Sequence, residues 1–324
     1  MSSVRVFFHD KCFDGSTSAA VFTAFYHACI APTAQFDYHG VSHKVGELFA
    51  PEDFAGQENA IVDFKYSSDP RVTWWFDHHQ SAFLTPADAA HFRQDRGGKK
   101  FYDPHYRSCT AFIAHIARTR FDFDPAPLAE LIQWADIVDG ALFESAQAAV
   151  ELRSPALQLT LAVEGAKTPG FIPRLIHDYQ HLSLRQILDQ DYVQAGLQPL
   201  LARHRQAIDL LSGLLECRDG VISFDLTAHA IDGYNKFIPY YLCPKGIYSV
   251  GISRGSFRTK VSVGSNPWQP SEHMVNLADL CERYGGGGHP RVGAISFPPG
   301  EVEAARQAAA EITAELRQAA ARIR

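Results

Sequence analysis

Three short apolar runs near the start of the chain each end in side chains that can bind a metal ion. The runs are residues 4–8, which lead into His9 and Asp10, residues 59–63, which end on Asp63, and residues 72–79, which end on Asp77, His78 and His79. Helical spacing follows the first run, with Ser16 or Thr17 as the expected N-cap, and this alternation is typical of a buried parallel sheet. Ligands bind at the carboxyl ends of the strands in such α/β sheets. The sequence therefore predicts an α/β domain with a ligand site at one edge of its sheet.

These side chains form a pattern that indicates a metal centre. A single aspartate at a strand end usually caps a helix or bonds to a loop, but three ligating groups after an apolar strand are costly unless something binds them. Carboxylates mixed with imidazoles suit Mn²⁺, Zn²⁺ or Fe²⁺ better than Ca²⁺. Two such ions, bridged by a carboxylate and a hydroxide, commonly hydrolyse phosphate esters. The candidates that strand-end geometry can bring to one rim are His9, Asp14, Asp63, Asp77, His78, His79, Asp136 and Asp139.

Length and composition predict two domains in a globular chain. The chain has 324 residues, of which 46% are hydrophobic and 20% charged, and a domain usually contains about 150 residues. A helical pattern that begins near residue 184 gives way after Gly220 to short β-like runs, among them residues 237–242 (FIPYYL). We expect an N-terminal metal-binding domain with a parallel sheet over residues 1–190, a helical linker over residues 191–216, and a smaller α/β substrate-binding domain over residues 217–324.

Charge, cysteine content and hydropathy indicate which partners and which cellular location to expect. Thirty lysines and arginines against 36 aspartates and glutamates give a net charge of −6, so no overall basic field exists to hold a long nucleic acid. The six cysteines are scattered without a CxxC pair, and the N-terminus lacks the pattern of a signal peptide. No apolar stretch approaches the ~18–20 residues of a membrane span. We expect a cytoplasmic protein with no membrane partner.

Five sequence motifs follow one another along the chain. They are FFHDKCFDGSTSAA, AIVDF, FDHHQSAF, WADIVDGALF and YGGGGHPRVGAISF. In kind and order they resemble the motifs of the DHH phosphoesterase superfamily with its associated C-terminal domain. The resemblance implies a catalytic α/β domain with two divalent metal ions, usually Mn²⁺, with Mg²⁺, Co²⁺ or Fe²⁺ as alternatives. It also implies a smaller domain that holds the phosphate of the substrate.

The resemblance assigns ligand roles in the first two motifs. His9 and Asp14 fall on ligand positions, and Asp63 matches the carboxylate that usually bridges the two ions. Many members have Asp-x-Asp in the first motif, whereas this chain has Cys12 two residues before Asp14. Cys12 is therefore either a thiolate ligand or a small buried side chain, and Asp10 is a further candidate for the missing carboxylate.

The third and fourth motifs supply the remaining candidates of the first domain. In the third motif the resemblance makes His78 the expected direct ligand, while His79 either binds a metal or contacts the reacting phosphate. We assign Asp77 and His79 to the catalytic step. Asp136 and Asp139 lie three residues apart in a helical segment, so they share a face, and both stay candidate ligands.

A run of four glycines followed by a histidine marks the second domain. A single glycine would suffice to end the preceding helix, so the run indicates close approach of the backbone to something else. Consecutive N–H groups can bind an anion, and a histidine can donate to a phosphate oxygen. The resemblance implies that this motif contacts the substrate. The substrate-binding candidates are Gly286, Gly287, Gly288 and His289, together with Arg254, which matches an arginine that the family uses on the substrate.

We therefore predict a metal-dependent phosphoesterase that acts on a short nucleotide, such as a short RNA oligomer, a nucleoside bisphosphate or a dinucleotide. A hydroxide activated by both ions would attack the phosphorus atom. The alternatives are hydrolysis of inorganic pyrophosphate or polyphosphate, and a non-catalytic nucleotide-binding or metal-sensing module. Trp268 is a candidate for stacking on a base, with a packing role as its alternative. A second copy of the chain, in a homodimer, is a further candidate partner.

Overall fold

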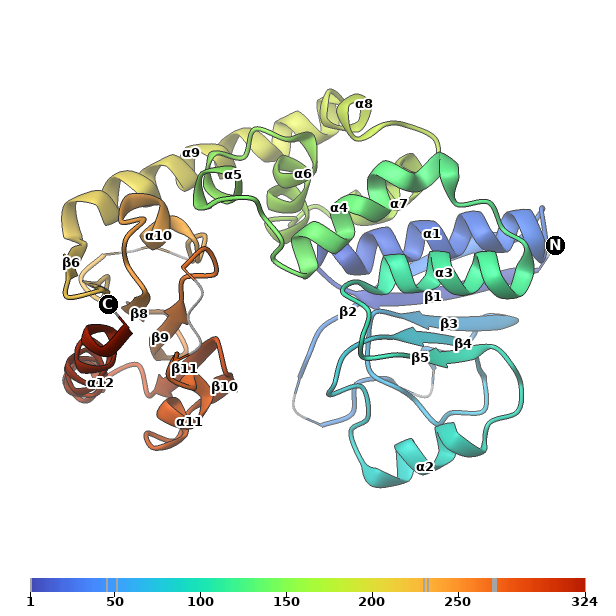
Figure 1. The fold of residues 1–324 in the computed structure, drawn as a ribbon. Helices are drawn as coiled ribbons and strands as arrows, with labels where there is room; N and C mark the ends of the chain where they lie inside the picture. Colours follow the sequence, from blue (N-terminus) through green and yellow to red (C-terminus); the bar gives the residue numbers. More distant parts are fainter. Residues whose placement is uncertain are drawn as a thin grey trace. The chain divides into compact units, whose positions relative to one another are not determined.

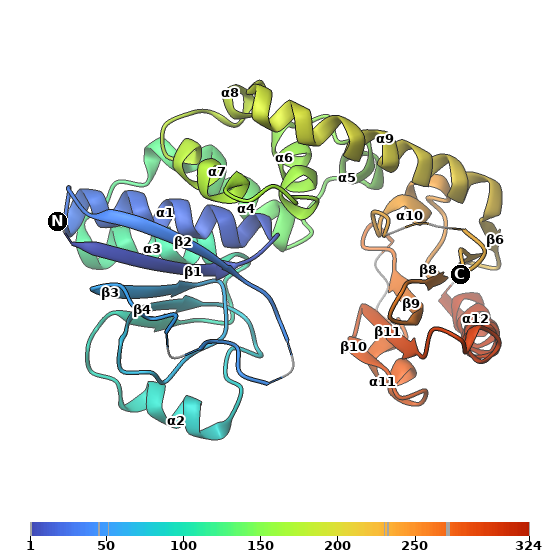
Figure 2. The same cartoon turned by 180° about the vertical axis from the view of Figure 1, so that it is seen from behind.

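The computed structural model describes residues 2–44, 46–50, 52–229, 231, 233–269 and 273–323. The chain divides into two compact units, whose elements are labelled in Figures 1 and 2. The first unit comprises Met1–Phe143 and Leu152–Leu200, and the second comprises Glu144–Glu151 and Leu201–Arg324. The short segment 144–151 therefore belongs to the second unit, although it interrupts the first in the sequence.

The first unit is built on a five-stranded, all-parallel sheet in the order β2-β1-β3-β4-β5. Its strands are β1 (Ser3–His9), β2 (Gln35–Val41), β3 (Glu58–Val62), β4 (Val72–Asp77) and β5 (Lys100–Tyr102). The register pairs Phe8 with Val62 and Val62 with Phe76, so the carboxyl ends of β1, β3 and β4 meet at one edge. The predicted α/β class, with a parallel sheet in the N-terminal part, is confirmed.

Helices surround this sheet. They are α1 (Phe13–Cys29), α2 (Pro86–Gln94), α3 (Cys109–Phe121), α4 (Ala129–Asp139), α6 (Pro155–Glu164), α7 (Phe171–Tyr179) and α8 (Leu184–Leu188), with a 3-10 turn at Ala126–Leu128. Figures 1 and 2 show α1 and α3 along one face of the sheet and α2 beyond the other. The expected N-cap at Ser16 or Thr17 is wrong, because α1 begins at Phe13 and both hydroxyls instead donate to the Phe13 carbonyl oxygen, at 2.8 and 3.0 Å.

Aromatic side chains of β4 fill the core on both faces of the sheet. Trp74 and Phe76 face α1, where their ring centroids lie 5.8 and 6.0 Å from that of Phe22. Trp75 points to the opposite face, where its ring meets Tyr66 edge-on at 4.7 Å. All three β4 side chains are fully buried, as expected for a strand covered on both faces. The strand is therefore fixed by packing up to the residue before Asp77.

A long helix, α9 (Asp191–Leu214), follows α8 and belongs to both units. Its residues up to Leu200 are part of the first unit, and the rest are part of the second.

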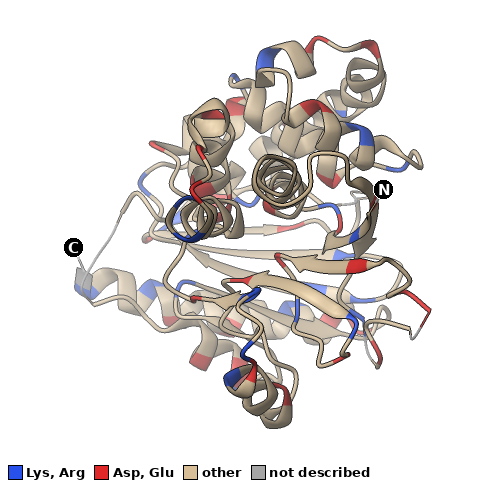
Figure 3. Ribbon diagram, turned by 90° about the vertical axis from the view of Figure 1, so that its right-hand side faces the viewer, with Lys and Arg blue, Asp and Glu red and all other residues tan. Residues whose placement is uncertain are grey.

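Among the described residues, no helix combines the length and the apolar character that crossing a bilayer requires. Figure 3 shows lysine and arginine interspersed with aspartate and glutamate along the ribbon.

The second unit contains a six-stranded mixed sheet in the order β10-β11-β9-β8-β7-β6. Its strands are β6 (Glu216–Arg218), β7 (Val221–Asp225), β8 (Tyr248–Arg254), β9 (Thr259–Ser265), β10 (Gly287–His289) and β11 (Val292–Phe297). β7 and β8 pair in parallel, and the other neighbours are antiparallel. The apolar stripe of α12 (Val302–Ile323), with Ile312 and Leu316, packs into the same core as Val250 and Val261 of the sheet.

Residues 237–242, which read as a strand from their aromatic and β-branched content, form helix α10 (Ile238–Leu242) instead. Pro239 lies in the first turn of α10, where its missing N–H leaves no hydrogen bond unmade. A disulfide joins Cys217 in β6 to Cys243, directly after α10. The other helices of this unit are α5 (Ala146–Glu151) and α11 (Leu277–Glu282).

Candidate metal centre

Three strand ends of the first unit bring predicted ligands to one edge of the sheet. His9 is the last residue of β1, Asp63 directly follows β3, and Asp77 is the last residue of β4. The N–H of Asp63 donates to the carbonyl oxygen of Phe76 at 3.0 Å. Asp63 has a φ of 55°, a left-handed conformation that is uncommon outside glycine and clusters at functional sites. The backbone thus turns at Asp63, next to the ends of β1 and β4.

The carboxylate of Asp63 lies at the centre of the cluster. It is 1% exposed, and neither of its oxygens has a hydrogen-bond partner among the described residues. Oδ2 lies 3.7 Å from Nδ1 of His9, and Oδ1 lies 3.4 Å from Nε2 of His78 and 3.8 Å from Nδ1 of His79. Burial acts to raise the pKa of Asp63, but these imidazoles outweigh it and lower the pKa to about 2. A buried, unbonded carboxylate is costly unless a cation neutralises it, so the site fits a metal ion.

Asp14 is held by the beginning of α3. Its Oδ2 accepts the N–H of Cys109 at 2.7 Å, and its Oδ1 accepts the N–H and the hydroxyl of Thr110 at 3.0 and 2.6 Å. The positive end of the α3 dipole favours a carboxylate at this place. Burial nevertheless raises the pKa of Asp14, as do the charges of Asp63 and Asp139. A cation would allow these carboxylates to stay ionised together.

His78 connects Asp14 and Asp63 through one ring nitrogen. Its Nε2 lies 3.6 Å from Oδ2 of Asp14 and 3.4 Å from Oδ1 of Asp63. Its Nδ1 donates to the carbonyl oxygen of Tyr106 at 3.0 Å. This hydrogen bond places the proton of a neutral ring on Nδ1 and leaves the lone pair of Nε2 toward the carboxylates, the arrangement typical of a histidine that binds a metal.

The structure separates the two candidate aspartates on α4. Oδ2 of Asp139 lies 3.5 Å from Nε2 of His78. Asp136 instead accepts a hydrogen bond from the hydroxyl of Ser108, the N-cap of α3, at 2.6 Å. Burial, followed by the charge of Asp63, raises the pKa of Asp139 to about 6. The geometry therefore favours Asp139 as a ligand and gives Asp136 a structural partner.

The described residues contain three groups of ligand atoms that lie within 4.8 Å of one another. The groups are His9 with Cys12 and Asp63, Asp63 with His78 and His79, and Asp14 with His78 and Asp139. Asp63 and His78 each occur in two groups, as expected where neighbouring ions share a bridging carboxylate. Burial, followed by the charges of Asp63 and Asp14, raises the pKa of the Cys12 thiol, so its thiolate would need a cation nearby. Asp10 is in none of these groups.

His79 is oriented by Asp77. Oδ1 of Asp77 accepts the N–H of His78 at 2.8 Å, and both the N–H and Nδ1 of His79 at 3.2 and 2.7 Å. The hydrogen bond between Nδ1 of His79 and the Asp77 carboxylate raises the pKa of His79. The His79 side chain is 38% exposed, whereas Asp77 is buried. With Nδ1 bonded to Asp77, Nε2 of His79 is the ring atom left for another partner.

Two features near the cluster were not among the predicted site residues. One is the pair of N–H groups at Cys109 and Thr110, which hold Asp14. The other is His43, whose ring lies 5.1 Å from that of His9 and stacks on Phe64 at 4.8 Å. His43 comes two residues after the end of β2, so the strand-end rule applied to β2 would have found it.

The glycine run of the second unit is part of a helix end and a hairpin. The N–H groups of Gly285 and Gly286 donate to the carbonyls of Glu282 and Cys281 at 3.0 and 2.9 Å, which ends α11 in a Schellman arrangement. A Cβ at Gly286 would collide with the Ala294 carbonyl oxygen, and a Cβ at Gly288 with that of Val292. Both glycines are thus required by the close approach of β11.

The remaining substrate-binding candidates lie on the surface of the second unit. A Cβ at Gly287 would meet no other atom within 4 Å. His289 ends β10 and Arg254 ends β8, and both side chains are exposed. Contact of these residues with a substrate stays a prediction.

Comparison with solved structures identifies the fold as that of DHH phosphoesterases. The structure of PggH, a pGpG-specific phosphodiesterase from Vibrio cholerae, matches with a TM-score of 0.70 and 17% identity over 97% of this chain and 99% of that one. The DHH domain of a protein from a family of ribosomal proteins matches with a TM-score of 0.56, 12% identity, and coverage of 96% and 86%. The RecJ structure with Mn²⁺ from Thermus thermophilus matches with a TM-score of 0.51 and 16% identity over 97% of this chain and 52% of that chain. No protein-family model and no curated protein matches the sequence.

The chain therefore has the fold of the DHH phosphoesterase superfamily, and the resemblance seen in its five motifs is confirmed at the level of the fold. PggH and RecJ, two of these structural neighbours, are hydrolases that act on phosphoester bonds.

Proposed function

We propose that this protein is a metal-dependent phosphoesterase that hydrolyses short nucleotide substrates. The observation that carries the proposal is the buried Asp63 carboxylate, whose two oxygens lack hydrogen bonds to the described residues and face ligand atoms on both sides. Such a group is the expected bridge between two divalent ions. The fold shared with PggH and RecJ supports a hydrolase of phosphoester bonds.

The donor set divides into a softer and a harder half. His9, Cys12 and Asp63 would hold one ion, and Asp14, His78 and Asp139 would hold the other, with Asp63 between them. Oxygen and imidazole ligands suit Mn²⁺, and the RecJ neighbour contains Mn²⁺. When bound, such ions lower the pKa of a water molecule so that hydroxide is available at neutral pH.

The protein's own part in the reaction falls to His79 and Asp77. Asp77 fixes the imidazole of His79 through Nδ1 at 2.7 Å and raises its pKa. A protonated His79 would donate from Nε2 to a phosphoryl oxygen and stabilise the charge that develops there. In the second unit, Arg254 and His289 would bind a phosphate that does not react. A net charge of −6 favours short substrates over long nucleic acids.

A substrate panel tests the proposal most directly. Wild-type protein is incubated with Mn²⁺ and, in turn, a linear dinucleotide, a cyclic dinucleotide, a nucleoside bisphosphate and pyrophosphate. We expect turnover of at least one nucleotide and loss of that turnover when EDTA removes the metal. Turnover of pyrophosphate alone would assign the protein to the polyphosphate-hydrolysing relatives, and metal binding without any turnover would indicate a sensing module.

A further inference from the structure

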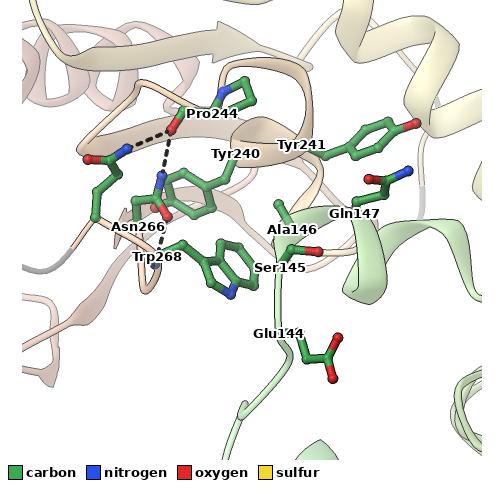
Figure 4. Close-up of a pocket in the computed structure, with 10 residues that line it drawn as sticks. Glu144, Ser145, Ala146, Gln147, Tyr240, Tyr241, Pro244, Asn266 and Trp268 are labelled. Carbon is green, nitrogen blue, oxygen red and sulfur yellow. Dashed lines mark hydrogen bonds between the residues drawn. The ribbon is translucent and has the colours of Figure 1, made fainter.

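The second unit contains a pocket of about 370 Å³, whose lining includes no predicted metal ligand and no residue of the glycine run (Figure 4). Its size lies in the range of small-molecule sites. Three aromatic residues line it, Trp268, Tyr240 and Tyr241, together with five polar ones: Glu144, Ser145, Gln147, Asn266 and Gln269. Glu144, Ser145 and Gln147 come from the segment 144–151, which belongs to this unit. The side-chain amide of Asn266 already donates to the backbone carbonyl oxygens of Pro244 and Gly246, and the amide of Gln269 donates to that of Pro244.

The aromatic side of the pocket is rigidly held. The ring of Trp268 packs edge-on against Phe237, with 5.4 Å between the centroids, and the backbone N–H of Trp268 donates to Oδ1 of Asn266 at 3.0 Å. Tyr240 is 3% exposed, and its hydroxyl is hydrogen-bonded to Ser249 at 2.8 Å. Flat apolar rings that are fixed before binding lose little entropy when they contact a planar ligand.

The polar side presents a carboxylate. Gln147 donates to Glu151 at 2.8 Å, and Ser145 accepts the N–H of Ala148 at 3.1 Å, so both side chains have partners. Glu144 is exposed and forms no hydrogen bond or ion pair with any described residue. Figure 4 shows the stretch that carries Glu144 and Ser145 beside the ring of Trp268, with the exposed carboxylate of Glu144 directed away from the ring, so that this side chain would turn to meet a ligand there.

These groups select the chemistry of the ligand. No lysine or arginine is among the described residues that line the pocket, which disfavours a phosphate. A flat ring system suits the aromatic side, and hydrogen-bond donors on its edge suit the carboxylate. Among nucleobases, guanine offers two adjacent donors, N1–H and the 2-amino group, whereas adenine presents the acceptor N1 at the corresponding edge.

We propose that this pocket binds a purine base of the substrate and prefers guanine to adenine. Trp268 contacts the face of the base, and Glu144 accepts its N1–H and 2-amino hydrogens. The inference rests on the proposed nucleotide substrate, but it concerns recognition of the base and not hydrolysis.

Binding of nucleosides tests the pocket without the reaction, because guanosine, inosine and adenosine carry no phosphate. Their affinities for the full-length protein are measured by titration calorimetry or ligand-observed NMR, with and without Mn²⁺. Guanosine should bind at least tenfold more tightly than adenosine, with inosine, which lacks the 2-amino group, in between, since hydrogen bonds to a charged group contribute strongly. Glu144→Gln should weaken the binding of guanosine roughly tenfold or more and leave the binding of adenosine nearly unchanged.

Three further variants keep the test decisive. Trp268→Ala should weaken the binding of all three nucleosides to a similar extent. Trp268→Phe, which keeps an aromatic ring against Phe237, should weaken their binding less. Glu282→Gln, an exposed change on α11 of the same unit, is the matched control and should change nothing.

Equal affinities for the three nucleosides, or unchanged guanosine binding in Glu144→Gln, would overturn the preference for guanine. Absence of nucleoside binding would refute the assignment of the pocket as a base-binding site, even if the protein hydrolyses nucleotides. Guanosine binding in a protein that hydrolyses none of the panel would instead leave the pocket standing and refute the proposed hydrolysis.

Discussion

The imidazole of His78 is tied to the carbonyl oxygen of Tyr106 by a hydrogen bond of 3.0 Å from Nδ1. This contact turns Nε2 toward Asp14, Asp63 and Asp139, at 3.4–3.6 Å. Four side chains from separate parts of the chain therefore converge on one small volume, in which Asp14, Asp63 and His78 are buried and the Asp139 side chain is 30% exposed. Burial, followed by the repulsion between these carboxylates, raises the pKa of Asp14 and of Asp139, and a cation would relieve that repulsion.

Replacement of Asp63 tests the bridging role. Asp63→Asn should reduce Mn²⁺ affinity at least 100-fold, because the amide carries no charge to join two cations. Mn²⁺ at 100 times its Kd should stabilise the wild type by about 2.7 kcal/mol, and melting curves should show no such gain in the variant. Asp189→Asn, an exposed change in the same unit, is the control. A variant that keeps its bound Mn²⁺, measured by elemental analysis, would contradict the bridge.

A matched pair on α4 separates a ligand from a structural residue. Asp139→Asn should lower metal affinity at least tenfold, since its carboxylate belongs to a ligand group. Asp136→Asn should leave metal affinity unchanged and destabilise the fold by about 1 kcal/mol, because it weakens the hydrogen bond from Ser108. Metal titration and urea unfolding of both variants check this. The opposite pattern would assign the ligand role to Asp136.

The thiol of Cys12 is tested by changing the hardness of the ligand. If Cys12 binds metal, Co²⁺ should give a thiolate charge-transfer absorption in the wild type that Cys12→Ser and Cys12→Ala lack. Cys12→Asp should shift preference toward Mn²⁺, the harder ion, by about tenfold or more relative to Zn²⁺. Identical spectra and affinities in all four proteins would show that Cys12 only fills space.

Arg254 and His289 are expected to act on the substrate and not on the metals. Arg254→Ala or His289→Ala should lower kcat/KM on a dinucleotide by roughly 10- to 150-fold, the effect of losing a charge-assisted contact. The loss should shrink on a chromogenic phosphodiester that has no second phosphate, while bound metal stays constant. Arg258→Ala, on the same exposed segment, serves as the control. An equal loss on both substrates would refute the phosphate contact.

Neighbouring glycines in β10 should differ sharply in tolerance. Gly288→Ala places a Cβ against the Val292 carbonyl oxygen, whereas Gly287→Ala meets nothing within 4 Å. We expect Gly288→Ala to cost about 1–3 kcal/mol of unfolding free energy and Gly287→Ala less than about 0.5 kcal/mol. Chemical denaturation measures both. Equal stabilities would mean that β11 can move away at little cost.

The sequence by itself determined the α/β class and the edge of the sheet at which the candidate metal ligands lie. Apolar runs that end in His9, Asp63 and Asp77 suffice for this, because parallel strands end on the same side and their side chains alternate with a fixed period. The order of the five motifs also indicates the superfamily fold. These features depend on local pattern and on a chirality rule that holds for all such sheets.

Only the tertiary structure decided between groups that the local pattern treats alike. Asp136 and Asp139 share a helical face, so the choice between them came from how α4 packs beside Ser108 and His78. The binding of Asp14 by the amides of α3 joins residues 95 and 96 positions apart, a separation that no local period encodes. Helix α10 and the pocket beside it likewise arise from long-range packing, which overrides the strand propensity of residues 237–242.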